Sequence, residues 1–502
     1  MPNAETLPSV VGPAWVDQSV RRIRGLFPLS VERYLNEAIG TFAPSVTTVT
    51  NVARSYALHG LVMAEAADKE LELEATRVLL RRAEVVMALA SIAHRDSPDH
   101  LRWYPAAHGA DQLINAWQRG PIDMDEVVGK GPAAYSQEDW GFLDPYTASE
   151  VRLGILGDPR TTPGDGFSDA LVRPALGDSL RLAREWTTVT RSQAEQVSHL
   201  CICRAGRSSD GEWLAGRLAG DPTKPMQVAG TIAATMTLVA KLLAHTRVRS
   251  EKDLADAISF SPLLGEDPLL VASPVARRWR GLTLRHTAVV AWRTLWAGMS
   301  RHAQEGGSFI PISDLQDWLA DQAPIQTVGQ FVDSLPATTN GDQPVDAEIR
   351  LETDLEDPLL AVARILLSGR RSTELEGDIE WGYLGEPTNN DRAQELSPRW
   401  VAHTTERWHD RPMTDFCNYL VKVLLDRSQR VALDKARYSG GRFVLPARVL
   451  LRDGFVEWRD REGASAPPLR LARIVHIGRQ VGLFADDQGY WIPGPRSGLI
   501  AG

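Results

Sequence analysis

The sequence predicts a mainly α-helical protein of several domains, ending in a small α+β module with the element order of a winged helix. Apolar residues recur every three or four positions over most of the stretch from residue 14 to 335, which is typical of amphipathic helices. Short runs rich in aromatic and β-branched residues appear mainly after residue 440, which favours strands there. A length of 502 residues suffices for about three domains.

The composition is that of a globular protein outside the membrane. It contains 43% hydrophobic and 24% charged residues, and no apolar run reaches the roughly 20 residues that a bilayer crossing needs. Residues 1–11 lack the basic and apolar regions of a signal peptide. Three cysteines fit a reducing compartment. We therefore expect a cytoplasmic protein that has no contact with a membrane.

An N-terminal helical domain is expected over residues 14–246, after a disordered tail over residues 1–13. One helix should begin near residue 45, where hydroxyl side chains can cap it. A second should cover residues 71–94, and together they suggest an antiparallel pair. Another periodic stretch predicts a helix over residues 226–246.

A second helical domain is expected over residues 247–336. Ser273 and Pro274 supply a cap and a first-turn proline to a periodic stretch that lasts until about residue 304. Two capping-box patterns, Ser313-x-x-Gln316 and Thr327-x-x-Gln330, predict two brief helices after it.

Residues 337–398 are interpreted as an acidic connector with one short helix. Between residues 342 and 395 there are 14 acidic and 5 basic side chains. Within this stretch, residues 358–368 are apolar enough to form a docked helix.

The last region, residues 399–502, is predicted to be the winged-helix-like module. A helix over residues 414–437 should stop at Ser439-Gly440-Gly441. The later elements are expected to be strands near 442–445 and 455–458, a helix over 468–481 and a strand near 490–493.

Charge is unevenly distributed along the chain. Residues 421–502 contain 14 Lys and Arg against 8 Asp and Glu, which leaves 41 against 56 for residues 1–420. Because 48 of the 55 basic residues are arginine, a high arginine content alone does not indicate phosphate binding. The concentration of basic residues at one end of the chain does indicate a contact surface. The candidate binding residues in this basic end are Arg427, Arg430, Lys435, Arg437, Arg442, Arg470, Arg473, His476 and Arg479.

Two kinds of partner fit this basic end. Several cations on a helix and wing can displace counterions from the phosphates of DNA or RNA. However, acidic residues stand among them, including Asp434, Asp453 and the expected wing tip Asp486-Asp487, and these would repel a duplex. A module that contacts another protein subunit, plausibly an ATPase or a nuclease, is therefore the other interpretation.

The sequence has none of the usual catalytic signatures. It lacks a phosphate-binding P-loop, a Gly-x-Ser-x-Gly elbow and a His-Glu-x-x-His helix. One alternative is enzymatic: Arg280 and His286 have the spacing found in the HEPN class of helical ribonucleases. The other interpretation of this pair is a core-facing histidine and a surface arginine on one long helix.

Metal binding is considered at two places. His199, Cys201 and Cys203 put three soft ligands within five residues, but zinc would need a fourth from elsewhere, and buried cysteines packing as hydrophobes are the alternative. Separately, His94, Asp99, His100 and His108 gather in one loop whose spacing matches no metal fingerprint, so we interpret it as a helix end and a solvated loop. No cofactor and no metal is expected.

Two segments resemble uncharacterised helical bacterial proteins, some of which are found beside phage-defence genes. The first pairs the turn Pro44-Ser45-Val46-Thr47-Thr48-Val49-Thr50 with the helix start Ala53-Arg54-Ser55-Tyr56. The second runs from Gln429 to Arg437 and on to Arg442-Phe443-Val444-Leu445. The resemblance implies a companion role in a multi-component assembly and brings no catalytic residue with it. We therefore expect a non-enzymatic adaptor or scaffold subunit.

Overall fold

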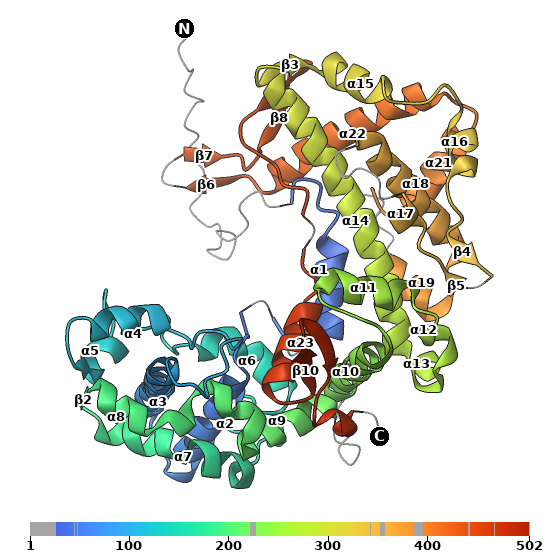
Figure 1. The fold of residues 1–502 in the computed structure, drawn as a ribbon. Coiled ribbons are helices and arrows are strands. Elements are labelled where there is room, and N and C mark those ends of the chain that lie inside the picture. Colours follow the sequence, from blue (N-terminus) through green and yellow to red (C-terminus); the bar gives the residue numbers. More distant parts are fainter. Residues whose placement is uncertain are drawn as a thin grey trace. The chain divides into compact units, whose positions relative to one another are not determined.

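The computed structural model describes residues 27–44, 46–47, 49–220, 227–341, 343–351, 357–385, 395–439, 442–465 and 467–500. The expected tail over residues 1–13 and parts of the expected connector lie outside these ranges. Within them the chain is mainly helical, as predicted (Figure 1). Every helix that the structure describes is too short or too polar to cross a lipid bilayer.

The chain forms two compact units, each built from separated segments. Unit 1 contains residues 1–38, 259–265 and 277–468. Unit 2 contains residues 39–258, 266–276 and 469–502. This division differs from the expected order of domains, because the chain leaves unit 2 near residue 258, returns to it briefly over residues 266–276, and rejoins it at residue 469.

Unit 2 is built around the long helix α3 (Leu73–His94), which packs on α2 (Ala53–Asp68) and α7 (Asp169–Glu185). Apolar residues spaced three and four apart on α3, such as Ala83, Val86 and Ala90, are fully buried. The remaining elements of the first part of unit 2 are α4 (Ala110–Trp117), β1 (Ile122–Asp123), α5 (Met124–Val128), α6 (Leu143–Arg152), β2 (Thr188–Val189), α8 (Arg191–Gln196), η2 (Ser198–Leu200), η3 (Ile202–Arg207) and α9 (Ser209–Ala219).

The second part of unit 2 brings distant segments together. Its elements are α10 (Gln227–His245), most of α11 (Glu251–Phe260), α13 (Pro268–Ala272), α23 (Leu471–Gln480), β10 (Phe484–Asp487), β11 (Tyr490–Pro493) and η4 (Ser497–Leu499). Strands β10 and β11 form an antiparallel hairpin in which Asp487 pairs with Tyr490. The turn residues Gln488 and Gly489 both have positive φ, as a two-residue hairpin turn requires.

A buried charged network lies in the core of unit 2. His59 of α2 contacts Glu84 through Nε2 at 2.9 Å and Glu150 through Nδ1 at 2.7 Å. Glu84 also accepts hydrogen bonds from the Phe142 backbone N–H and the Tyr135 hydroxyl. Although burial opposes ionisation of the imidazole, the two carboxylates outweigh it and raise the pKa of His59 to about 10. This histidine is therefore charged at neutral pH and paired on both ring nitrogens.

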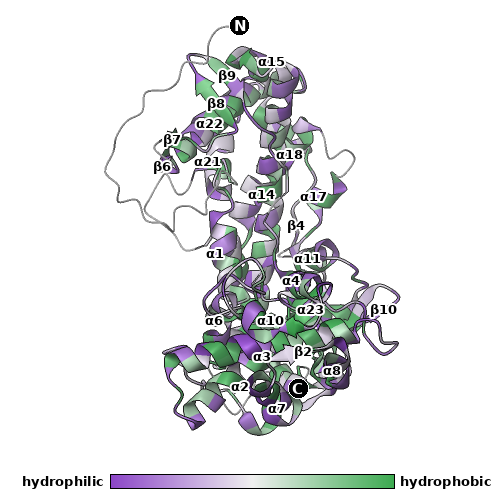
Figure 2. Cartoon of the chain, turned by 90° about the vertical axis from the view of Figure 1, so that its left-hand side faces the viewer, coloured by the Kyte–Doolittle hydropathy of each residue, from purple (hydrophilic) through white to green (hydrophobic). Residues whose placement is uncertain are grey.

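Unit 1 is organised around α14 (Pro274–Glu305), whose Trp279 and Trp292 are almost fully buried, and α18 (Pro358–Glu374). Asp357 caps α18, since its carboxylate accepts from the backbone N–H groups of Leu359 and Leu360. Apolar residues make up much of these helices (Figure 2). The other helices are α15 (Ile312–Ala320), α16 (Val328–Ser334), α17 (Ala347–Arg350), α19 (Gly377–Leu384), α21 (Pro398–Trp408) and α22 (Met413–Asp434). Helices α1 (Arg33–Phe42) and α12 (Leu263–Glu266) have residues in both units.

The sheets of unit 1 are small. Strand β9 (Phe455–Trp458) pairs with both β8 (Val449–Arg452) and β3 (Phe309–Pro311), all antiparallel. The other two pairs are β4 (Thr339–Asn340) with β5 (Gln343–Pro344) and β6 (Arg437–Ser439) with β7 (Arg442–Val444).

Most predicted helices and strands lie within a few residues of the observed ones. The capping box at Thr327 and Gln330 is present, with both of its hydrogen bonds. The one predicted at Ser313 and Gln316 is wrong, because α15 already begins at Ile312 and has no side-chain cap. The turn of Ser45 and Thr48, expected to cap a helix, lies outside the described residues, and α2 begins at Ala53.

Candidate functional site

The nine basic residues predicted to form one contact surface are divided between the two units. Unit 1 contains Arg427, Arg430, Lys435, Arg437 and Arg442, and unit 2 contains Arg470, Arg473, His476 and Arg479. Arg437 is half-buried on β6, and the side chain of Arg442 on β7 lies outside what the structure describes. The predicted residues therefore do not come from a single module.

Three of the unit 1 cations, Arg427, Arg430 and Lys435, bind groups of unit 1 itself. Arg427 and Arg430 both bind the carboxylate of Glu395, at 3.2 Å and 2.6 Å. The ammonium of Lys435 donates to the backbone carbonyl of Phe27 at 2.8 Å. Burial lowers the pKa of Lys435. These groups bind other parts of their own chain, so less of their charge is available to a partner.

The outer side of α23 is covered by the loop over residues 95–108, here called the 95–108 loop. The guanidinium carbon of Arg479 lies 4.4 Å from the ring centre of Trp103, and the His476 ring lies 5.9 Å from it. Arg479 also lies 3.7 Å from Asp486 on the following hairpin. Burial, together with neighbouring arginines, lowers the pKa of His476 to about 4, so this histidine is neutral at pH 7.

Both ends of α23 are fixed within unit 2. Arg470, at its N-terminal end, donates to the carbonyl of Val46. At the other end, the side chain of Gln480 accepts from the Ala53 N–H at 2.9 Å and its backbone carbonyl accepts from the Tyr104 hydroxyl at 2.9 Å. Every residue of α23 is buried or half-buried, whereas a helix that reads a DNA groove needs a free face.

The hairpin after α23 packs against α10 through β11, and the start of α23 is hydrogen-bonded to the start of α11. Both helices come more than 200 residues earlier (Figure 1). The backbone N–H of Trp491 on β11 donates to the carbonyl of Val248, between α10 and α11, at 2.8 Å. The carboxylate of Glu251, the first residue of α11, accepts from the backbone N–H groups of Leu469 and Ala472 at 2.7 Å and 2.9 Å. A side chain of α11 thereby caps α23 across the intervening segment.

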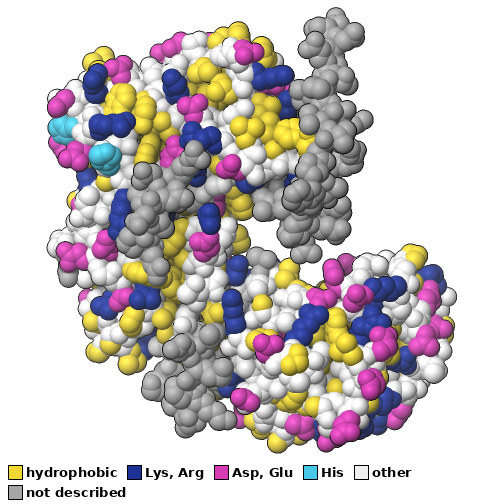
Figure 3. Space-filling view, turned by 180° about the vertical axis from the view of Figure 1, so that it is seen from behind, with side chains coloured by type: hydrophobic (Ala, Val, Ile, Leu, Met, Phe, Trp, Pro, Cys, Tyr) yellow, Lys and Arg dark blue, Asp and Glu magenta, His cyan; other side chains and the backbone are white. Residues whose placement is uncertain are grey.

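The hairpin after α23 is acidic at its tip, where Asp486 and Asp487 stand beside the turn. Figure 3 shows the molecule from behind, the side away from α23 and its hairpin as drawn in Figure 1, and there basic side chains are interspersed with acidic ones. A phosphate backbone would meet mixed charge on this face.

Arg280 and His286, the alternative catalytic pair, lie on α14 in buried or half-buried positions. Arg280 is 2% exposed, and its guanidinium donates to the carbonyls of Ser259 and Ser261 and to Gln343. His286 Nε2 lies 3.3 Å from the carbonyl of Pro467. Because they are six residues apart on one helix, the two side chains also point about 120° away from each other. The hydrogen bonds of Arg280 hold segments of unit 1 together, so this arginine serves the packing of unit 1.

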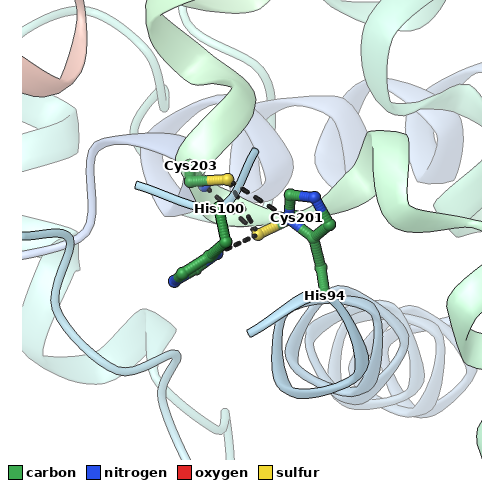
Figure 4. A group of neighbouring side chains, drawn as sticks. All are labelled: His94, His100, Cys201 and Cys203. Carbon is green, nitrogen blue, oxygen red and sulfur yellow. Dashed lines mark hydrogen bonds between the residues drawn. The ribbon is translucent and has the colours of Figure 1, made fainter. Parts of the chain in front are cut away.

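A different group of chemically active side chains converges in unit 2. His94, His100, Cys201 and Cys203, here called the Cys–His cluster, each offer one ligand atom, and these four atoms all lie within 4.8 Å of one another (Figure 4). Sγ of Cys201 lies 3.3 Å from Sγ of Cys203 and 3.8 Å from Nδ1 of His100. Sγ of Cys203 lies 3.4 Å from Nδ1 of His94. Three of the four residues are buried and His100 is half-buried.

Local structure brings each pair of ligands into place. Helix α3 ends at His94, and successive turns follow it, with hydrogen bonds from the Ser97 N–H to the His94 carbonyl and from the His100 N–H to the Ser97 carbonyl. On the other side, Cys201 is an extended residue between the short helices η2 and η3. The Ile202 N–H donates to the Ser91 hydroxyl of α3 at 3.1 Å, which ties the two segments together.

The buried side chain of Arg54 fixes the backbone of the cysteine segment through hydrogen bonds. It is 1% exposed, and its Nη1 donates to the carbonyls of Cys201 and His199, both at 2.7 Å, while its Nε binds Asp210 at 2.9 Å. Arg54 belongs to the Ala53-Arg54-Ser55-Tyr56 motif on which the sequence resemblance rests. The motif therefore has a structural purpose here, which is to fix the backbone beside Cys201.

The imidazole of His94 has a carboxylate partner on its other nitrogen. Nε2 lies 2.9 Å from Oδ1 of Asp99, which leaves Nδ1 directed at the cysteines. Arg204 lies 2.5 Å from the same carboxylate and 3.1 Å from Nε2. Ser97, His94 and Arg204 hold the pKa of Asp99 well below its usual range. An ionised carboxylate behind a histidine is the usual outer partner of a metal-binding imidazole.

The two thiols have different acidities. The S–H of Cys201 donates to Cys203 and, against the effect of burial, lowers the pKa of Cys203 to about 5, with His94 and His100 contributing in the same direction. The pKa of Cys201 is raised. A thiolate with two imidazoles beside it can bind a soft or borderline divalent metal. His100 also lines a cavity of about 420 Å³, together with Arg95 and Arg102, which gives solvent a route to this residue.

From the sequence, the four members of the Cys–His cluster were predicted in two separate places: His94 and His100 in a solvated loop, and Cys201 and Cys203 together with His199. His199 is not part of the cluster, because its Nε2 lies 3.1 Å from the carboxylate of Asp178 on an exposed surface. The signal that could have linked the two places is that the cysteine segment lacked a further ligand for zinc, while the loop offered histidines with no assigned partner.

The chain matches no protein-family model, no curated protein and no solved structure in the comparisons made.

Proposed function

We propose that this protein is a non-enzymatic adaptor subunit whose contact module is a winged helix assembled in unit 2 from separated segments. The order helix, strand, helix, helix and two-stranded wing is typical of winged helices, which are a helix-turn-helix variety used for contacts with DNA or protein. In unit 2 the corresponding elements are α10, the single bridge residue Val248, α11, α23 and the β10–β11 hairpin.

The observation on which this proposal rests is the capping of α23 by Glu251. A side chain from the start of α11 accepts two hydrogen bonds from the start of α23, 218 and 221 residues later. Together with the Val248–Trp491 bridge, this joins the start of α11 to the start of α23 and to the hairpin. The segment between α11 and α23 supplies most of unit 1 and is an insertion into this module in the proposal.

A protein partner is favoured over DNA for this module. Trp103 covers the side of α23 that would face a duplex, Arg479 is engaged by Trp103 and Asp486, and the wing tip has two carboxylates. Approach of phosphates to Asp486 and Asp487 is repulsive. A basic protein surface would instead be attracted to the same wing tip.

The nuclease alternative receives less support. Arg280 donates hydrogen bonds to Ser259, Ser261 and Gln343 within its own unit, so facing RNA would require breaking them. A ribonuclease assay of the full chain beside the His286→Ala variant keeps this alternative open to direct test.

The test is co-expression of the full chain with the products of the genes that neighbour its own, followed by size-exclusion chromatography. We expect one product to co-elute and the Asp487→Lys variant, at the exposed wing tip, to bind it more weakly and with altered salt dependence. The matched control is Asp68→Lys, an exposed carboxylate at the end of α2, which should leave binding unchanged. Salt-dependent retention of duplex DNA that is lost in Arg473→Glu would show instead that the module binds nucleic acid.

A further inference from the structure

We propose that the Cys–His cluster is a structural Zn²⁺ site, with His94, His100, Cys201 and Cys203 as its four ligands. This inference does not depend on the adaptor role, because it rests on the ligand geometry alone. It replaces the expectation from the sequence that no metal is bound.

The ligand set is the first argument. Two thiolates and two imidazoles are one of the common combinations for structural zinc. With Zn–S near 2.3 Å and Zn–N near 2.0–2.1 Å, tetrahedral coordination places ligand atoms about 3.3–3.8 Å apart. For the separate pairs this means about 3.8 Å for S···S and about 3.5 Å for S···N. The two S···N contacts of the cluster are 3.4 and 3.8 Å. The S···S distance of 3.3 Å would lengthen by about half an ångström on binding. The remaining pairs, at most 4.8 Å apart, need only a small rotation of side chains to meet the same geometry.

Charge is the second argument. Within the cluster itself there is no carboxylate and no permanent cation, and each cysteine lies beside one of the imidazoles. Two thiolates carry two negative charges, which a divalent zinc ion neutralises.

The role of the ion follows from the closed ligand set. Four protein ligands fill a tetrahedral shell and leave no position for a substrate or an activated water, so the site is structural rather than catalytic. Asp99 holds His94 by its other nitrogen and Arg54 holds the backbone of Cys201. Both are positioning residues, because neither offers an atom to the metal.

What the metal fixes is the 95–108 loop. His94 stands just before this loop and His100 is within it, whereas Cys201 and Cys203 lie about 100 residues later beside α9. Zinc would therefore clamp the loop to the body of unit 2, and the same loop presents Trp103 to Arg479 and Tyr104 to Gln480 of α23. Metal binding and the covering of α23 are thus linked through a single short segment.

The first measurement is the metal content of the full chain, purified in reducing buffer with zinc present in the growth medium. We expect about one zinc per chain by inductively coupled plasma mass spectrometry. Cys203→Ser and His100→Ala should lose it. Two matched controls should keep it: Cys417→Ala, which removes the third buried cysteine, and His199→Ala, which removes the histidine next to the cysteine pair.

A second measurement decides the case even if the cluster variants fold poorly. Wild-type protein stripped of metal and loaded with Co²⁺ should show the visible d–d bands of a tetrahedral ion and the near-ultraviolet band of a cobalt–thiolate bond. Wild-type protein that holds no zinc after reconstitution and gives no such spectrum overturns the proposal. So does zinc that survives Cys203→Ser or disappears in His199→Ala.

A third measurement addresses the loop. Arg95 and Arg102 are exposed trypsin sites within it. If zinc clamps the loop, a chelator should accelerate cleavage after Arg102 at least several-fold, whereas cleavage after the exposed Arg33 of α1 should not change. Equal rates with and without chelator would show that the metal, where present, does not hold this segment.

Discussion

Two buried polar clusters lie along the same helix of unit 2 and satisfy their groups in different ways. At Glu84 of α3, two carboxylates surround the imidazole of His59, and a tyrosine and a backbone N–H complete the hydrogen bonding of Glu84. At the end of the same helix, His94 meets His100 and two cysteines with no opposite charge inside the cluster. The first cluster is balanced largely by its own residues, and the second needs a cation from outside.

The difference shows why burial alone does not identify a ligand site. The charged network of His59 has carboxylate partners on both ring nitrogens, so neither nitrogen is left to bind an ion. In the Cys–His cluster only the outward nitrogen of His94 meets a carboxylate, while Nδ1 and both sulfurs face one another. A site is indicated where good ligand atoms converge without a protein partner that neutralises them.

The largest effect is expected from removing the metal. Cys203→Ser should lower the free energy of unfolding of unit 2 by more than about 4 kcal/mol, because loss of a bound metal belongs to the most destabilising changes known. Thermal unfolding with and without a chelator measures this. Wild type should lose stability on chelation, and the variant should be insensitive to it. Equal chelator effects in both would contradict a zinc-dependent cluster.

A somewhat smaller loss is expected at the self-balanced cluster. Glu84→Ala removes one of the two carboxylates of His59 and leaves the Tyr135 hydroxyl unpaired, so it should cost about 3–5 kcal/mol. Urea unfolding monitored by tryptophan fluorescence measures the change. The control is Glu74→Ala on the same helix, where the carboxylate is exposed and paired only at the surface, with an effect below about 0.5 kcal/mol.

The charge of His59 also makes stability depend on pH. Its pKa is raised from 6.5 to about 10 on folding, so its contribution is complete below about pH 6.5 and declines as pH rises toward 10. The raised pKa of Glu150 in the same network reduces the size of this effect. We expect the difference in unfolding free energy between wild type and His59→Gln to shrink between pH 7 and 9.5. A difference that stays constant with pH would mean that His59 is neutral in the folded state.

A weaker effect should follow from changing the outer partner of His94. Asp99→Asn removes the charge behind the imidazole but keeps its shape, and loss of such a partner lowers metal affinity by about 10- to 100-fold. Competition with a fluorescent zinc chelator gives the affinity. Because Asp99 is about half exposed, the fold should be unaffected, and an unchanged affinity would remove Asp99 from the site.

The smallest effect belongs to His199, which adjoins Cys201 in sequence but not in the cluster. Its contact with Asp178 is exposed, so His199→Ala should change stability by less than about 0.5 kcal/mol and leave zinc content intact. Metal analysis and thermal unfolding of this variant test whether a histidine that is close to Cys201 in the sequence, but outside the cluster in space, contributes to zinc binding.

Much of the local structure was predictable. Helical spacing of apolar residues located α3, α10, α14 and α22 to within a few residues, and the strands near 455–458 and 490–493 are present. Strand β3 at Phe309–Pro311 was not predicted, because three residues between two helices carry too little pattern and pair only with β9 from the far end of the chain.

The sequence by itself determined which segments are helices, where caps and turns stop them, and which residue types are able to bind a metal, because each of these depends on neighbours a few positions apart. Only the tertiary structure decided that His94 and His100 meet Cys201 and Cys203, and that Glu251 caps a helix 218 residues later. Such meetings are set by the packing of whole helices, and the spacing of residues along the chain contains no record of them.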